Sequence, residues 1–385
     1  MNYYLTEEQK MIKQLARQIA EERIKPVREH YDRTGEFPWE IVEVLAKSDM
    51  FRVFIPEEYD GLGGGVFEMA LVTEELSRVC GGIALAFAGT ALGAYPIILF
   101  GSEEQKRHYL PDIAAGKRLA AFALTEPDAG SDAAAVKTKA IKEQDHYIIN
   151  GTKQWITNGG EAEIYTVFAL TRPERGTRGI SALIVEKGTE GFDFGKKENK
   201  MGIRGSTTRE LIFQNCRVPA DNLLGKEGLG FVIAMRTFDI SRPGVAAQAV
   251  GIAQGAYEEA AKYAKERKQF GKKIINFQAI QFILADMAIQ IEAARALVYQ
   301  AAKNADSGEK DIAKTSSIAK IFASDTAMRV TTDAVQIFGG YGYMKEYPVE
   351  KMMRDAKITQ IYEGTNQILR TVIGSSIIRE LSGKN

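Results

Sequence analysis

The spacing of apolar residues changes twice along this 385-residue chain, and that change limits the possible folds more than any other feature. Apolar residues recur at helical spacing over residues 1–118 and again from about residue 228 to the C-terminus. Between these parts, short runs rich in β-branched and aromatic residues alternate with turn residues. This order predicts an α+β multidomain protein with an N-terminal helical domain at 1–118, a small β-barrel or β-sandwich domain at 119–226, and an antiparallel C-terminal four-helix bundle at 227–385.

Local signals predict the ends of several elements. Thr6 and Gln9 form a capping-box pattern at the start of the first helix, which Pro26 ends. In the β region, Asn150 and Gly151 lie between two strand-like runs and predict the turn of a β-hairpin. In the C-terminal region, helices are expected over residues 231–237, 243–267, 278–302, 312–338 and 365–381.

Composition narrows the classes of function. Lys plus Arg and Asp plus Glu both number 50, so the chain lacks the basic excess that is typical of nucleic-acid-binding proteins. The chain has no run of about 18 apolar residues, so no transmembrane segment is expected. Its start does not resemble a signal peptide. Cys80 and Cys216 lie far apart and the three histidines form no ligand pair, so we expect a cytoplasmic protein without a disulfide framework or a metal site.

One carboxylate is a candidate general base. Glu363 lies between Tyr362 and Gly364, at a break between two helical runs whose apolar residues adjoin it. Burial against apolar surface disfavours a charged carboxylate and raises its pKa toward the range of a general base. Gly364 would let a ligand approach the backbone, and Thr365 and Gln367 offer hydrogen bonds beyond it. The alternative, which spacing alone favours, is a surface glutamate before a glycine helix end, with Thr365 capping the next helix.

Two motifs in the β region could form a binding site. A strand-like run through Phe122 opens into a loop at residues 124–132, whose free amides and hydroxyls suit a polar ring edge, a phosphate or a thioester oxygen. The alternative interpretation of this loop is a simple turn with acidic caps. Trp155 and Thr157 belong to a second motif at residues 153–159, although a tryptophan in a strand is more often a core residue.

Three motifs in the C-terminal region carry charge or glycine. Arg242 precedes a proline, which predicts a helix N-terminus beside a guanidinium and hence a suitable place for an anionic ligand. The alternative is a capping Asp239 and a surface arginine. Arg267 and Phe270 lie at a cationic helix end that could meet a pyrophosphate or could simply be solvated. Glycines at residues 339–340 could allow a ligand close to the backbone or could only end a helix.

In this order, these motifs resemble those of the acyl-CoA dehydrogenase family over essentially the whole chain, with IYEGTNQI around Glu363 as the C-terminal motif. The resemblance implies that Glu363 is the catalytic base, and that the substrate contacts Ser131, Asp239, Arg242 and Gly364. It implies FAD contacts at Phe122, Leu124, Thr125, Ser131, Trp155, Ile156, Thr157, Arg267, Phe270, Gln278, Gln336, Gly339, Gly340, Thr365 and Gln367. Among these, Arg267, Phe270, Gln278 and the glycines would bind the FAD of a neighbouring subunit. The chain has neither a Rossmann fingerprint nor a P-loop motif, so flavin binding is expected from the resemblance alone.

The activity that the resemblance implies is FAD-dependent dehydrogenation of an acyl-CoA thioester to trans-2-enoyl-CoA. Glu363 would remove the α-proton, the β-hydrogen would pass as hydride to flavin N5, and an electron-transfer flavoprotein would receive the electrons. The family further implies a homotetramer that acts in fatty acid β-oxidation. The residue before Arg242 is Ser241, so Glu363 has no rival base at that position.

Several alternatives stay open. The same residues could serve an enoyl-CoA reductase that runs the chemistry in reverse, or the chain could be a non-catalytic or nucleic-acid-associated member of the fold. Residues 83–92, which resemble the acyl-pocket helix of the family, carry no charge, and this argues against a dicarboxylic acyl group. Short or medium straight acyl chains are preferred, while branched and cyclic groups remain possible.

Overall fold

The computed structural model describes residues 3–309 and 312–383. Its N-terminal part is helical, as predicted, and consists of α1 (Glu7–Ile19), α2 (Arg28–Thr34), α3 (Trp39–Lys47), α4 (Val66–Ser77), α5 (Gly81–Phe100) and α6 (Glu103–Ala114). The predicted capping box is confirmed, because the N–H groups of Gln9 and Thr6 donate to each other's side-chain oxygens. The chain continues from α1 as a π-helical turn, Ala20–Ile24, and the helical run stops before Pro26.

The central part is a β domain, as predicted. Its strands are β1 (Ala120–Ala123), β2 (Lys139–Glu143), β3 (His146–Thr157), β4 (Ile164–Leu170), β5 (Ile180–Glu186), β6 (Phe192–Lys197) and β7 (Thr208–Pro219). They join in one sheet in the order β1-β4-β2-β3-β7-β6, with β5 paired to β4. β1 runs parallel to β4, whereas β3 is antiparallel to both β2 and β7. Short 3-10 turns connect elements at Met50–Phe54, Glu57–Tyr59, Ala133–Ala135, Pro173–Gly179 and Ala220–Asn222.

The hairpin predicted at Asn150 and Gly151 is wrong. Both residues lie inside β3, at a bulge where its register with β7 shifts. The runs on either side of the bulge pair with the same neighbour, β7, so the chain continues straight on instead of turning back. The Asn150 side chain contributes by accepting a hydrogen bond from the Asn215 N–H at 2.8 Å. A Cβ at Gly151 would lie 2.7 Å from the Thr138 Cα, so this position requires glycine for close approach and not for a turn.

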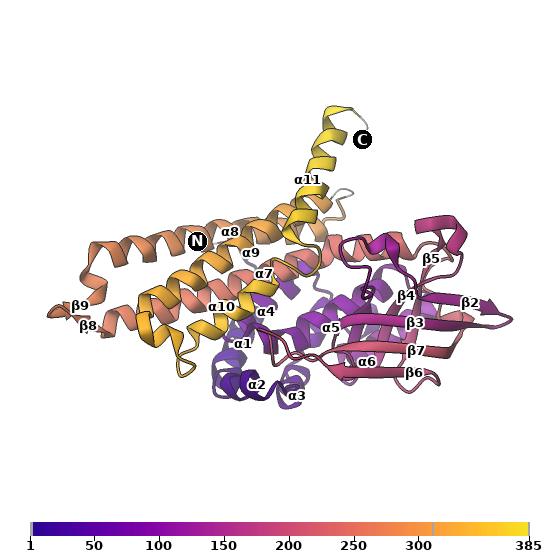
Figure 1. Ribbon diagram of the computed structural model, residues 1–385, viewed down its shortest axis with the longest axis horizontal. Helices are drawn as coiled ribbons and strands as arrows, with labels where there is room; N and C mark the ends of the chain where they lie inside the picture. The colour runs from indigo at the N-terminus through magenta and orange to yellow at the C-terminus, as the bar shows by residue number, and fades with distance from the viewer. Residues whose placement is uncertain (1–2, 310–311, 384–385) are drawn as a thin grey trace.

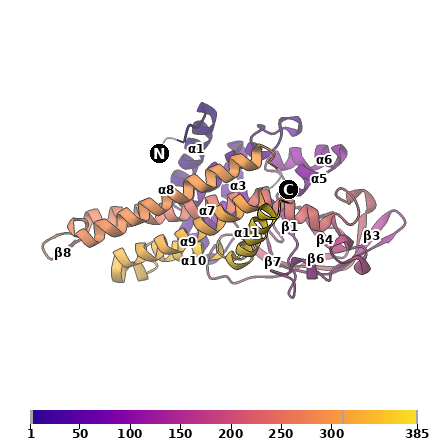
Figure 2. The ribbon, with the colours of Figure 1, turned by 90° about the horizontal axis from the view of Figure 1, so that it is seen from above.

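The C-terminal part is a helical bundle, which confirms the predicted fold class. Its helices are α7 (Gly230–Glu266), α8 (Gln278–Asp306), α9 (Ala313–Phe338), α10 (Val349–Ile358) and α11 (Asn366–Leu381). A small hairpin of β8 (Lys268–Gln269) and β9 (Lys272–Lys273) separates α7 from α8, with 3-10 turns at Ile274–Asn276 and Gly339–Tyr343. Helices α7, α8 and α9 lie side by side along their lengths, with α10 against α7 and α9 (Figure 2). The β domain and the β8–β9 hairpin lie at opposite ends of the bundle (Figure 1).

The helix start predicted after Arg242 is also wrong. Residues 231–237 and 243–267 belong to the single helix α7, with Pro243 in its interior. A proline lacks the N–H that would bond to the previous turn, which normally disfavours this position. Here α7 is buried between α4, α5 and α9, and this packing outweighs the missing hydrogen bond. Arg242 consequently lies in mid-helix and not at a helix N-terminus.

Helix α5 connects the two halves of the molecule. It packs against β1 on one side and against α7 on the other. At Gly93 it lies so close to the sheet that a Cβ would be 2.4 Å from the Ala121 nitrogen. The expectation that the chain has no apolar run of about 18 residues is wrong, because α5 is long and apolar enough to cross a membrane by length and composition alone. However, 72% of its apolar window is buried inside the protein. This is the behaviour of a core helix, so α5 is no clear membrane span.

A buried ion pair holds the loop that follows β1. Lys153 has no exposed surface, and its Nζ donates to Glu126 Oε1 at 2.7 Å and to the Leu124 carbonyl at 3.0 Å. Glu126 also accepts hydrogen bonds from the N–H groups of Lys137 and Thr138. Burial lowers the pKa of Lys153 to about 8, and the nearby carboxylate opposes that shift. The pair therefore fixes the backbone of residues 124–126 against β3.

We expect Lys153→Met to destabilise the protein by about 3–5 kcal/mol, because it leaves the buried Glu126 carboxylate without its cation. The free energy of unfolding in urea, followed by circular dichroism of the cofactor-loaded protein, would measure this loss. Lys139→Met, on an exposed position of β2, is the matched control and should change stability by less than about 0.5 kcal/mol. Equal stability of the two variants would contradict a structural role for the pair.

Candidate active site

A cavity of about 140 Å³ lies where the three parts of the chain meet. It is lined by side chains from α4, α5, the β domain, α7 and the loop before α11. Of the residues predicted from the sequence, it brings together Phe122, Thr125, Trp155, Ile156, Thr157 and Glu363. Residues that are far apart in the sequence thus line one cavity.

Glu363 lies in a strained turn on the wall of this cavity. It has a φ of 50°, which is unusual for a residue other than glycine, and Gly364 follows with a φ of 96°. The Ser241 hydroxyl donates to Glu363 Oε2 at 2.5 Å. Burial raises the pKa of Glu363 above its ordinary value, while the Ser241 hydrogen bond and the charges of Arg242 and Lys320 oppose the rise. The carboxylate is therefore poorly solvated but not isolated.

Arg242 acts inside the protein and does not lie on its surface. It is 5% exposed, and its Nε donates to the Glu363 carbonyl at 3.3 Å. Its Nη1 donates to Asp239 Oδ1 at 3.1 Å, and its guanidinium lies over the Phe238 ring. These contacts join α7 to the turn that carries the carboxylate, so Arg242 and Asp239 adjoin the cavity from behind Glu363.

The β domain contributes an aromatic ring and hydroxyl groups to the lining of the cavity. Trp155 has a φ of 57° and is 59% exposed, so it is not the core tryptophan of the alternative interpretation. Thr125 and Thr157 line the cavity beside it. Leu124 is buried, with its carbonyl bonded to Lys153. Ser131 lies farther along the loop, is exposed, and does not line the cavity.

The remaining C-terminal residues form a separate group at the far end of the bundle. Arg267, Gly339 and Gly340 line a cavity of about 470 Å³, in which Arg267 lies over the Tyr341 ring. At a rise of about 1.5 Å per residue, Arg242 and Arg267 are roughly 37 Å apart along α7. Within one chain these residues cannot contact a ligand held at Trp155. Phe270, Gln278 and Gln336 are exposed at this same end.

Thr365 and Gln367 follow the Glu363 turn. The Thr365 hydroxyl accepts a hydrogen bond from the Ile368 N–H at 3.2 Å, so it caps α11 as the alternative interpretation of this stretch expected. Gln367 is exposed in the first turn of that helix. The cap and the buried carboxylate occur together, so the two interpretations of this stretch do not exclude each other.

Sequence reasoning missed three contributors to the site. Tyr362 donates its hydroxyl to Gln248, and both residues line the cavity. Lys320, on α9, donates to the Gly364 carbonyl at 2.8 Å. A lysine among small residues on a helix was the one available signal for Lys320, and it is weak.

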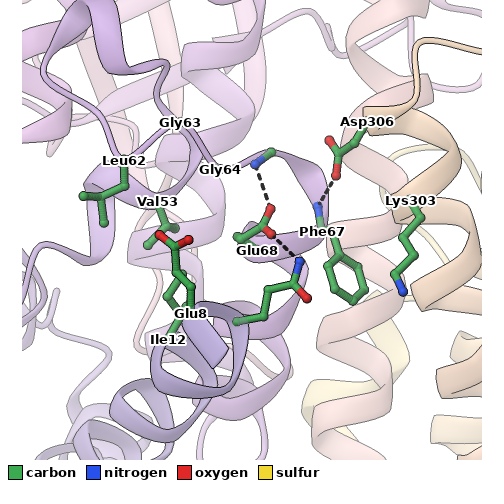
Figure 3. Close-up of a pocket in the computed structure, with 12 residues that line it drawn as sticks. Glu8, Ile12, Val53, Leu62, Gly63, Gly64, Phe67, Glu68, Lys303 and Asp306 are labelled. Atoms are coloured by element: carbon green, nitrogen blue, oxygen red, sulfur yellow. Dashed lines mark hydrogen bonds between the residues drawn. The ribbon is translucent and has the colours of Figure 1, made fainter. Parts of the chain in front are cut away.

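Another cavity, of about 460 Å³, lies between α1, α4 and α8 (Figure 3). Two of its acidic groups have partners: Asp306 accepts from the N–H groups of Val66 and Phe67, and Glu68 accepts from Gln9. None of the substrate-binding, cofactor-binding or catalytic residues predicted from the sequence lines this cavity. Nowhere in residues 3–309 and 312–383 do three His, Cys, Asp or Glu side chains gather to hold a metal ion.

The two groups of predicted residues suit the two ends of a flavin dinucleotide. Hydroxyls beside an exposed indole, as at Thr125, Thr157 and Trp155, suit the edge and face of an isoalloxazine ring. At the far end, a Cβ on Gly339 or Gly340 would meet nothing within 4 Å, so the backbone there is open beside the Arg267 cation. An open backbone next to a guanidinium suits a pyrophosphate.

Comparison with known proteins agrees with this picture. The chain matches the family models of the acyl-CoA dehydrogenase N-terminal domain at residues 6–117, the middle domain at 121–216 and the C-terminal domain at 228–378. It is 50% identical to the short-chain-specific acyl-CoA dehydrogenase of Clostridium acetobutylicum, over 98% of this chain and 100% of that protein. It is 51% identical to the acryloyl-CoA reductase (NADH) of Anaerotignum propionicum, over 98% of this chain and 96% of that protein.

Solved structures show the same fold. Butyryl-CoA dehydrogenase from Megasphaera elsdenii superposes with a TM-score of 0.96 at 49% identity, covering 98% of this chain and 100% of that one. A chain from the study of the electron transferring flavoprotein of Acidaminococcus fermentans has a TM-score of 0.96 at 52% identity and the same coverage. Acyl-CoA dehydrogenase complexed with FAD from Bacillus anthracis has a TM-score of 0.90 at 36% identity, covering 99% of this chain and 68% of that one. The chain belongs to the acyl-CoA dehydrogenase family and is an oxidoreductase of that family.

Proposed function

We propose that this protein is an FAD-dependent acyl-CoA dehydrogenase in which Glu363 removes the α-proton of the acyl thioester. The observation that carries the proposal is the position of Glu363 in the lining of the same small cavity as Trp155 and Thr157. A base and a flavin-binding surface in one small space suit removal of a proton and a hydride from adjacent carbons.

Glu363 is suited to act as a base because neighbouring groups stabilise its negative charge only partly against the cost of burial. Burial raises its pKa, which strengthens it as a proton acceptor relative to an exposed glutamate. The Ser241 hydroxyl and the Arg242 cation oppose this rise in pKa and favour the charged form of the carboxylate. The α-proton would pass to a carboxylate oxygen of Glu363.

The backbone beside Glu363 offers a way to acidify the α-carbon. Among the described residues, the N–H of Glu363 donates to no acceptor, so it is available to a ligand. If the thioester carbonyl oxygen accepted a hydrogen bond from this N–H, the fixed donor would stabilise the enolate-like negative charge that develops on that oxygen. The Arg242 contact with the Glu363 carbonyl holds this peptide in place.

The cofactor is proposed to be held by two copies of the chain. When bound, FAD supplies the two-electron acceptor for the β-hydrogen. Leu124, Thr125, Trp155 and Thr157 of one copy would orient the ring and keep water away from the reacting carbons. Arg267, Phe270, Gln278 and the 339–340 glycines of another copy would hold the dinucleotide, because they cannot reach the same ligand within one chain. This requirement supports the expected homotetramer, and the Acidaminococcus fermentans likeness supports an electron-transfer flavoprotein as acceptor.

The cavity suits a short, uncharged acyl chain. Its walls include Met69, Leu85, Ala88 and Leu92, and apart from Glu363 its lining carries no ionisable carboxylate or cation. An apolar wall does not bind the second carboxylate of a dicarboxylic substrate. Together with the names of the Clostridium and Megasphaera relatives, the lining supports a short straight-chain acyl-CoA, and hence a role in cytoplasmic fatty acid β-oxidation.

A second candidate function is reduction of a short enoyl-CoA. The likeness to an acryloyl-CoA reductase at 51% identity favours it, and the same residues would serve, with Glu363 returning the proton. The midpoint potential of the ligand-bound cofactor decides between the directions: a potential well below that of the enoyl-CoA/acyl-CoA couple supports the reductase. The non-catalytic alternative gains no support from relatives that are named as enzymes.

Glu363→Gln should retain bound FAD but lower the rate of dehydrogenation by at least about 100-fold, because an amide cannot accept the α-proton. Stopped-flow reduction of the flavin by substrate would measure the rate, and the visible spectrum would report FAD content. Glu174→Gln, in an exposed turn, is the control and should leave the rate unchanged. A fast Glu363→Gln enzyme would remove Glu363 from the mechanism.

The rate should also depend on pH through Glu363. Since only the carboxylate form accepts a proton and burial raises its pKa, kcat/KM should fall on the acid side with an apparent pKa above the ordinary glutamate value of about 4.3. The Ser241 hydrogen bond favours the charged form, so Ser241→Ala should move this acid limb to higher pH. A limb that stays fixed or moves to lower pH in Ser241→Ala would contradict the assignment.

Anaerobic titration should rank the substrates. We expect butyryl-CoA to bleach the flavin absorbance more completely than octanoyl-CoA, because the cavity is small, and glutaryl-CoA to have little effect, because its second carboxylate would be buried without a cation. The flavin band of the purified protein would be followed during each titration. Strong bleaching by glutaryl-CoA would overturn the proposed acyl specificity.

A further inference from the structure

Lys320 lies directly behind the turn that carries Glu363. Its side chain comes from α9 and has no exposed surface. The Nζ donates to the Gly364 carbonyl at 2.8 Å and to Asn366 Oδ1 at 3.0 Å. A buried ammonium is costly unless it is bonded, and here its bonds are to the residues that follow the proposed base.

Asn366 connects this lysine to both ends of the turn. Its Nδ2 donates to Asp325 Oδ1 at 2.8 Å and to Ser324 Oγ at 2.9 Å, which ties it to α9. Its backbone N–H donates to the Gln360 carbonyl at 3.0 Å, on the other side of Glu363. The backbone hydrogen bond between Asn366 and Gln360 therefore closes this segment into a loop, and Lys320 attaches the loop to α9.

Two buried cations hold two successive carbonyls of this segment. Arg242, from α7, donates to the carbonyl of Glu363, and Lys320, from α9, donates to the carbonyl of Gly364. Both residues of the turn have positive φ, a conformation that persists only where its surroundings restrain it. The two helices restrain it from different sides.

We propose that Lys320 is a positioning residue for the reaction: it fixes the Glu363–Gly364 turn against α9 and places a positive charge beside the base. This inference rests on the proposed function of Glu363. Lys320 would not contact the substrate or the cofactor, and it would act only through the turn and through its charge.

The charges around the turn come from several elements. α7 contributes Arg242, Asp239 and the Ser241 hydroxyl, α9 contributes Lys320 and Asp325, α5 contributes the Tyr95 hydroxyl, and the turn itself contributes Tyr362 and Glu363. Burial lowers the pKa of Lys320 to about 7, while Glu363 and Asp325 oppose that shift and Arg242 adds to it. The positive charge of Lys320 is therefore present at pH values below about 7. Removing that charge should raise the pKa of Glu363, because a nearby cation favours the carboxylate.

The test compares the pH dependence of kcat/KM for butyryl-CoA in FAD-loaded Lys320→Met, Lys320→Gln and Lys320→Arg. Both neutral variants should move the acid limb up by about one pH unit. Lys320→Met should also lower kcat by at least about 10-fold, because its turn is no longer held. Lys320→Arg should keep the limb near its wild-type position. Lys314→Met, on the same helix but paired with Glu380 at the surface, is the control and should match the wild type.

An acid limb at the wild-type pH in the FAD-loaded neutral variants would overturn the proposal. If Lys320→Met fails to fold, Lys320→Gln decides the question, since its amide can still donate to the Gly364 carbonyl. Loss of folding in both neutral variants would also overturn it, because Lys320 would then serve the fold alone. Glu363→Gln separates the two ideas: if that variant is inactive while the Lys320 variants keep the wild-type limb, only the positioning role fails.

Discussion

The site depends on one physical constraint: a carboxylate must be held in a strained turn and partly shielded from water while its charged form is still favoured by its neighbours. Two buried cations meet this constraint from two packed helices, Arg242 from α7 and Lys320 from α9. Each cation bonds to a backbone carbonyl and also lies near the carboxylate, so it restrains the turn and limits the rise in the pKa of Glu363. Since α7 and α9 pack along their lengths, the turn is fixed relative to the rest of the bundle.

The cavity in front of this turn exists because an uncharged helix separates the sheet from the bundle. Helix α5 contacts β1 at Gly93 without an intervening side chain and contacts α7 on its other face. The Trp155 side of the cavity and the Glu363 side therefore belong to different parts of the chain but share a rigid spacer. Their separation is set by packing, as an enzyme that must align two adjacent carbons requires. The second buried ion pair, between Lys153 and Glu126, steadies the loop on the sheet side.

Elements with a purely local cause could be predicted from the sequence. The capping box of Thr6 and the cap formed by Thr365 each depend on residues within one helical turn, and the structure contains both. The predictions of a turn at Asn150 and of a helix start after Arg242 were wrong for a common reason. Packing against distant parts of the chain can override a local turn or proline signal. Strand β7 pairs with β3 on both sides of the bulge at Gly151, and α7, which contains Pro243, packs against α4 and α9.

The sequence by itself determined the order of the three parts and the absence of a competing carboxylate before Arg242, because each is carried by residue type and local spacing. Spacing alone favoured a surface glutamate at residue 363, and its role as a candidate base was expected from the resemblance to the family. Tertiary structure alone decided that Trp155 faces a cavity, that Arg242 lies inside a helix, and that Lys320 meets Gly364. Lys320 and Gly364 are brought together only when the loop before α11 folds back onto α9, and side-chain contacts of that kind leave no period or motif in the chain. The same holds for the distance along α7 between the two proposed cofactor-binding groups, which makes a second copy of the chain necessary for the proposed site.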